Sequence, residues 1–157
     1  MSGIHLFAGA HAFLGEIGAL CFLWALVEII NRSEASLARA RFAGCLGVVL
    51  LFASLFAAGY PYLVHYGPLA KPAIKAGPMP WGHEVVMEAK EHIFMFIPIL
   101  ALCVTISLHL AKRDGALSSV YRYIGFMCGV IVVMVFMMAG MGFIIATAVR
   151  VAVGRGV

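Results

Sequence analysis

Charged side chains are scarce in this sequence. Only 11% of its 157 residues are Asp, Glu, Lys or Arg, and 64% are hydrophobic, whereas a typical soluble domain has about 25% charged residues. So few charges cannot cover a surface that faces water. The composition therefore excludes an ordinary soluble domain and indicates a protein whose mass lies in a lipid bilayer.

Several motifs are missing as well. None of the four cysteines belongs to a CxxC or CxxCH pattern, which argues against covalently attached haem and against a thiolate zinc site. No P-loop or GxGxxG pattern occurs, and the basic residues form no single stripe, so nothing indicates a nucleotide or nucleic-acid site. The first ten residues lack a basic segment, so we expect no cleavable signal peptide.

Four apolar segments are present, and each is long enough to cross the hydrocarbon core, which takes about 20 residues. The predicted spans are residues 7–30, 42–64, 92–111 and 120–149, and the longest connection is 65–91. These segments take up almost the whole chain. The sequence therefore predicts an all-α integral membrane protein, a single domain over residues 1–157 that folds as an up-down-up-down four-helix bundle.

Basic residues gather around the two short connections that follow the first and third spans. They are Arg32, Arg39, Arg41, Lys112, Arg113 and Arg122. Because cytoplasmic loops carry an excess of Lys and Arg, we expect both termini and the connection 65–91 to lie outside, although Arg150 and Arg155 oppose this tendency. In a Gram-negative bacterium that side is the periplasm, and the membrane is the inner (cytoplasmic) one.

Five of the six histidines fall at the predicted outer end, and only His109 lies at the other end. An ionisable residue at membrane depth is costly and by default indicates function. His11 and His92 lie near the starts of the first and third spans, which run parallel and face each other diagonally in such a bundle. Two imidazoles at one depth can ligate a haem iron from both sides. We therefore predict one haem b with His11 and His92 as axial ligands. His65 and His83 are weaker alternatives for the second ligand.

Other side chains at this end suit a haem. Glycine and alanine residues in the first and fourth spans would let a flat ring approach the backbone. Cations that would pair with the propionates are Lys71, Lys75, Lys90 and Arg150. This end of the bundle is therefore predicted to hold the cofactor.

Acidic residues leave several alternatives open. Glu16, in the first span, either forms a structural hydrogen bond or belongs to a proton or quinone path. Glu28, near the other end of that span, is expected to pair with Arg32 four residues on. One helix face carries a further polar set that is typical of a solvated helix and could alternatively bind a non-haem metal; its members are Glu84, Glu88, Glu91 and His92.

Methionines support a second hypothesis. The fourth span carries Met127, Met134, Met137, Met138 and Met141. Thioether sulfur suits Cu(I), so these residues and the outer histidines could handle copper or another transition metal. Methionine also fills irregular gaps between helices, and one of them could serve as an axial haem ligand. In a third hypothesis, the polar residues only pack, and the chain is a non-catalytic structural subunit.

The order of these features resembles small bacterial four-helix membrane proteins, one group of which is the DUF2231-like domain of unknown function. The resemblance rests on His11 opening the first span, His92 opening the third, the basic pair Lys112-Arg113, and a fourth span that contains glycine. The His-Pro opening of that group is absent, since Ala12 follows His11. Four-helix b-type cytochromes with histidines on two helices are similar by analogy.

The sequence thus favours an electron-transfer subunit over a stand-alone enzyme. We expect a haem b cytochrome that passes electrons between the quinone pool and a carrier or complex at the outer face. Its expected partners are the lipid bilayer, a quinone, and other membrane or periplasmic subunits in an oligomer or larger complex. Nucleic acid is not among them.

Overall fold

The computed structural model describes residues 2–31, 33–111 and 118–154, and over these residues it is entirely helical apart from short connections. Four stretches are helical, long and apolar enough to cross a membrane. The elements in chain order are α1 (Ser2–Asn31), α2 (Glu34–Pro61), the π-helical η1 (Tyr62–Ala70), α3 (Lys71–Ala76), the π-helical η2 (Gly82–Met87), α4 (Glu88–Leu110) and α5 (Ser118–Val153). The predicted all-helical chain with four apolar spans is confirmed. Arg32, Lys112, Arg113 and Arg155, which entered the prediction of orientation, lie outside the described residues.

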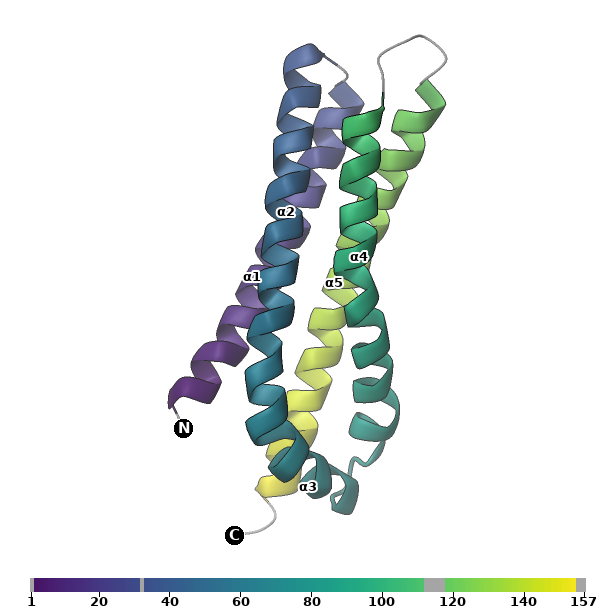
Figure 1. Cartoon of the computed structure of the whole chain (residues 1–157). Coiled ribbons are helices and arrows are strands. Elements are labelled where there is room, and N and C mark those ends of the chain that lie inside the picture. The colour runs from purple at the N-terminus through teal and green to yellow at the C-terminus, as the bar shows by residue number, and fades with distance from the viewer. Residues whose placement is uncertain (1, 32, 112–117, 155–157) are drawn as a thin grey trace.

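The four long helices form an antiparallel bundle (Figure 1). α1 packs against α2 and α5, and α4 packs against the same two helices. α1 and α4 are therefore diagonal neighbours. Both begin at the end of the bundle where α3 lies and where α5 finishes (Figure 1). We call this the α3 end.

Two element boundaries differ from the predicted ones. α2 begins at Glu34 and not at residue 42, because Ser33 caps it: the Ser33 side chain accepts a hydrogen bond from the Ser36 backbone N–H at 3.0 Å. Such a cap satisfies a backbone donor that the helix itself leaves unpaired. Arg39 and Arg41, which were predicted to lie around a short connection, therefore lie on the first turns of α2.

The predicted connection 65–91 is mostly helical, with an irregular stretch only at residues 77–80. Pro68 lies inside η1, and Pro72 lies in the first turn of α3. Proline fits a first helical turn. Inside an α-helix it would clash with the carbonyl four residues earlier, and here the chain changes to π-helical bonding without ending the helix.

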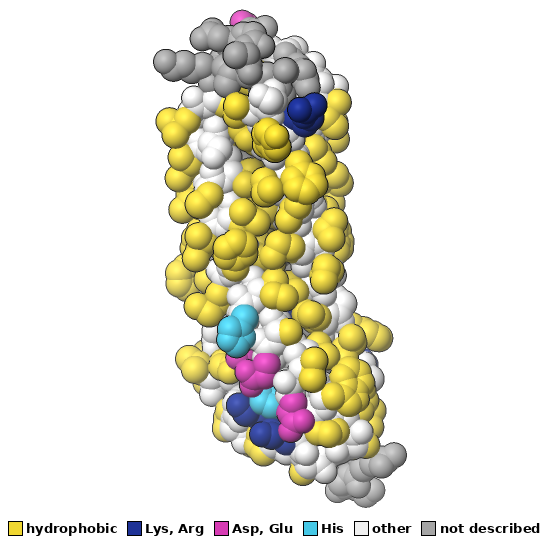
Figure 2. Space-filling model, turned by 90° about the vertical axis from the view of Figure 1, so that its right-hand side faces the viewer, with side chains coloured by type: hydrophobic (Ala, Val, Ile, Leu, Met, Phe, Trp, Pro, Cys, Tyr) yellow, Lys and Arg dark blue, Asp and Glu magenta, His cyan; other side chains and the backbone are white. Residues whose placement is uncertain are grey.

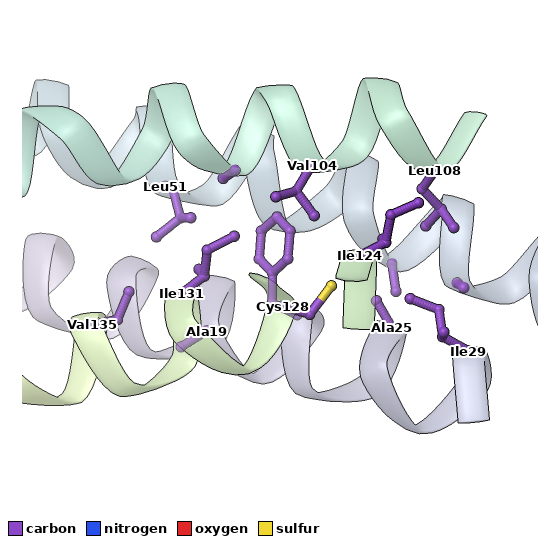
Figure 3. Close-up of a cluster of buried hydrophobic side chains, with 14 of the residues drawn as sticks. Ala19, Ala25, Ile29, Leu51, Val104, Leu108, Ile124, Cys128, Ile131 and Val135 are labelled. Carbon is purple, nitrogen blue, oxygen red and sulfur yellow. The ribbon is translucent and has the colours of Figure 1, made fainter. Parts of the chain in front are cut away.

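Buried side chains from all four long helices meet along the bundle axis (Figure 3). Phe22 of α1 and Leu51 of α2 are at most 2% exposed, as are Ile97 of α4 and Ile131 of α5. Small residues bring α1 and α2 close together: a Cβ added to Gly47 would lie only 2.7 Å from the Phe22 ring. Glycine at such a contact is typical of helices that pack in membranes.

The outer surface is apolar over most of its length. Figure 2 shows hydrophobic side chains covering one face, with histidine, acidic and basic side chains gathered near the α3 end. Many large apolar residues are exposed on every long helix, among them Leu6, Phe56, Phe96 and Phe126. This surface is compatible with contact with lipid, as expected for a multi-pass membrane protein.

Candidate functional site

A cleft opens among the four long helices, in the half of the bundle nearer the α3 end. Its volume is about 370 Å³, within the range of small-molecule sites. It is lined by Ala8, His11, Ala12, Gly15, Glu16, Leu51, Ser54, Lys90, Phe94, Ile97, Pro98, Val135, Met138, Ala139, Gly142, Phe143 and Ala146. An apolar cleft with a few polar groups is the usual form of a ligand site.

His11 is the best-anchored polar residue of the cleft. Its Nδ1 lies 3.1 Å from the backbone oxygen of Ser54 and 2.9 Å from the Ser54 hydroxyl. That hydroxyl donates its own proton to the His11 backbone oxygen at 2.8 Å. Both Ser54 oxygens can therefore accept a proton from Nδ1, which leaves the lone pair of Nε2 available. The His11 ring also meets the Phe94 ring edge to face, with centroids 5.0 Å apart.

Lys90 brings a cation to the same cleft. A Cβ added to Gly142 of α5 would lie 3.2 Å from the Lys90 Nζ, so the ammonium reaches across from α4 to α5. Within the described part of the chain, no hydrogen bond or ion pair to this ammonium is found, and it is close enough to His11 to interact electrostatically. A cation without a protein partner in an apolar cleft favours a ligand that carries an anionic or acceptor group.

His92 is not among the cleft residues. Its side chain is exposed, and its Nδ1 bonds to the Glu88 backbone oxygen at 2.7 Å. The cleft-lining residues of α4 are Lys90, Phe94, Ile97 and Pro98, and a residue two positions after Lys90 lies about 200° around the helix. The predicted matched depth of His11 and His92 is compatible with the parallel course of α1 and α4, but the structure does not bring the two rings together in the cleft.

The remaining predicted site residues fall into two groups. Glu16 lines the cleft, although much of its surface is exposed. The others do not line it: His65 is half-buried on η1, His83 is buried on η2, Lys71 and Lys75 lie on α3, and Arg150 is exposed near the end of α5. Of the cations predicted to meet propionates, Lys90 alone is a cleft residue.

Among the methionines of α5, Met138 lines the cleft and is 5% exposed. Met134 and Met141 pack against the core. Over the described residues, no three His, Cys, Asp or Glu side chains come together as a metal site. The polar face predicted from Glu84 to His92 is thus not assembled into such a group.

Sequence reasoning missed Ser54 entirely. It is fully buried, and its one signal was a hydroxyl inside an otherwise apolar stretch. Comparison with family models, with curated proteins and with solved structures gave no match for this chain. The resemblance to DUF2231-like proteins therefore stays a prediction.

Proposed function

We propose that this chain is a membrane electron-transfer subunit that binds one haem b in the cleft, with His11 as an axial ligand. The observation that carries the proposal is the anchoring of His11 by Ser54. Histidines that ligate metals almost always donate their other ring N–H to a nearby acceptor, which fixes the ring and directs the free nitrogen. Ser54 provides such acceptors for Nδ1.

The residues of the cleft fit a flat, largely apolar ring. Gly15 of α1 and Ala139 and Gly142 of α5 contribute no large side chain to the cleft, and Lys90 would supply a cation for a propionate. Met138, whose thioether lines the cleft, would be a second residue that could hold the haem. A bound haem would supply one-electron redox chemistry, while this chain holds the ring, excludes water and places charge beside it.

We infer a role inside a larger complex. Almost all described residues belong to the bundle, so little surface remains outside a membrane for docking a soluble carrier. In this proposal the redox partners are the quinone pool and a carrier or subunit at the α3 end, in a bacterial cytoplasmic membrane.

The test is the visible spectrum of the purified protein after reconstitution with haem, before and after reduction by dithionite. We expect a sharp α-band for the unaltered protein. His11→Ala should abolish it, and His92→Ala should retain it, because His92 lies outside the cleft. Full haem binding by His11→Ala, or none by the unaltered protein, would refute the assignment. Bound copper without an α-band would favour the metal-handling hypothesis.

A second candidate occupant is a quinone. Its support is the set of polar residues that line an apolar cleft, namely His11, Ser54, Glu16 and Lys90, whose ammonium has no partner among the described residues. Such a set suits a ring with two carbonyl oxygens and an apolar tail. Binding of a short-chain ubiquinone analogue that is weakened by Lys90→Met, in a protein that binds no haem, would favour this function.

A further inference from the structure

A second polar site lies outside the cleft, where η1 and η2 meet. Tyr66 of η1 places its hydroxyl 3.0 Å from Nδ1 of His83 of η2. Nε2 of His83 lies 3.4 Å from a carboxylate oxygen of Glu88, at the start of α4. The three side chains form a continuous phenol–imidazole–carboxylate chain.

Glu88, at one end of this chain, is exposed, and the other two members are buried. The His83 side chain is only 3% exposed and Tyr66 is 9% exposed, whereas the Glu88 side chain is 45% exposed. The polar chain therefore connects the surface with the interior of the protein. Beyond Tyr66, the ring of Tyr62 stacks at a centroid distance of 5.7 Å, and Glu91 is close enough to both tyrosines to interact electrostatically.

Two further observations separate this arrangement from ordinary packing. Each of the two buried members lies on a π-helical segment. π-Helical turns are rare in proteins as a whole, and those that occur are often found at functional sites. In addition, one carboxyl oxygen of Glu91 is shielded from solvent and has no hydrogen-bond partner among the residues that the structure describes. A buried acceptor left unpaired in this way is costly.

We propose that Glu88, His83 and Tyr66 form a proton relay between the surface at the α3 end and the buried side of Tyr66, where Glu91 lies. This relay goes beyond the proposed haem function and does not depend on it.

The proton balance of one transfer is simple. In the resting relay, Tyr66 donates its O–H to Nδ1 of neutral His83, and Nε2–H of His83 donates to the Glu88 carboxylate. A transfer outward moves the Tyr66 proton to Nδ1 and the Nε2 proton to Glu88. The phenolate oxygen then takes a proton from the protonated carboxyl group of Glu91, which becomes a carboxylate. One O–H bond forms at Glu88 for each one broken at Glu91, and no electron is transferred.

The relay can be tested by NMR on haem-free protein with ¹⁵N-labelled histidine, with the His83 signals assigned from a His83→Gln variant. We expect the tautomer with hydrogen on Nε2, and exchange of that hydrogen with water that is far faster than 3% exposure would allow. Glu88→Gln keeps a hydrogen-bond acceptor but cannot take the proton, so it should slow the exchange at least tenfold. Glu84→Gln, an exposed carboxylate of the same segment, should leave it unchanged.

Tyr66→Phe serves as a second variant, because it removes the acidic hydrogen that Nδ1 accepts while keeping the ring. It should alter the Nδ1 shift of His83. The proposal is overturned by a tautomer with hydrogen on Nδ1, or by exchange in Glu88→Gln that equals that of the unaltered protein while the backbone spectrum shows an intact fold.

Discussion

Glu28 shows how a single carboxylate is held at the end of the bundle opposite α3. It was predicted to pair with Arg32, which lies outside the described residues. In the structure it accepts hydrogen bonds from Arg39 of α2, from Nε at 2.7 Å and from a terminal nitrogen at 2.8 Å. The Trp24 indole donates a further one at 3.0 Å. The carboxylate is therefore bound across two helices.

Replacing Arg39 should lower the stability of the protein more than replacing Glu28 does. The Glu28 side chain is 10% exposed and that of Arg39 is 49% exposed. Arg39→Ala leaves a shielded carboxylate without its partner, whereas Glu28→Gln leaves a guanidinium that water can reach. We expect Arg39→Ala to lower the midpoint of thermal unfolding more than Glu28→Gln does. The double variant should recover part of the loss. Equal losses in the two single variants would contradict this explanation.

Ser54 is the residue whose role in the cleft can be separated from ligation itself. Ser54→Ala removes the hydroxyl that bonds to both Nδ1 and the backbone oxygen of His11, but it keeps the Ser54 carbonyl. Loss of such an outer partner typically weakens metal affinity 10- to 100-fold, so we expect haem affinity to fall by about that factor, measured by haem titration. Unchanged affinity would mean that the carbonyl alone fixes the ring.

Close packing of α1 against α2 depends on glycines. Cβ atoms added to Gly18 and Gly47 would lie 3.0 Å and 2.7 Å from side-chain atoms of the other helix. Real Cβ atoms do not approach a rigid ring so closely, and at Gly47 the nearest atom belongs to the buried Phe22 ring. The contact therefore requires the absence of a side chain at this position.

We expect Gly47→Ala to destabilise the bundle by about 1–3 kcal/mol, the usual cost of overpacking a core. The measurement is reversible unfolding in mixed micelles. Gly59→Ala on the same helix is the matched control, because nothing lies within 4 Å of a Cβ added there. Alanine should be neutral or stabilising at an uncrowded helical position, so a loss in Gly59→Ala as large as that in Gly47→Ala would contradict this explanation.

The molecule as a whole is polarised along its axis. The start of α1, the end of α5 and the segment from η1 to η2 lie at the α3 end (Figure 1), and five of the six histidines lie on these segments or at the start of α4. Both the cleft and the proposed relay belong to this half. Which side of a membrane it faces stays a prediction from the distribution of basic residues.

That sidedness can be measured with single cysteines in a variant that lacks the native four. Lys75 lies on α3, and Asn31 lies at the opposite end of the bundle. Each is replaced by cysteine in a separate variant. In intact cells, a membrane-impermeant maleimide should label Lys75→Cys at once and Asn31→Cys only after the membrane is permeabilised. The reverse order would place the α3 end inside the cell.

The sequence alone determined the helical class, the number of spans and the gathering of histidines at one end. These follow from local properties: a run of apolar residues must satisfy its backbone hydrogen bonds within the segment, so it forms a helix of the length that a bilayer requires. Because successive spans cross the bilayer in opposite directions, their order in the chain then decides at which end of the bundle each residue lies. His11 was identified because an ionisable residue in such a run is costly.

Only the tertiary structure decided which residues share a site. Helices that are apolar on all sides carry no stripe to fix their rotation, so sequence could place His11 and His92 at one depth but could not tell that only His11 faces the cleft. The roles of Ser54 and Lys90 also depend on which helices pack together.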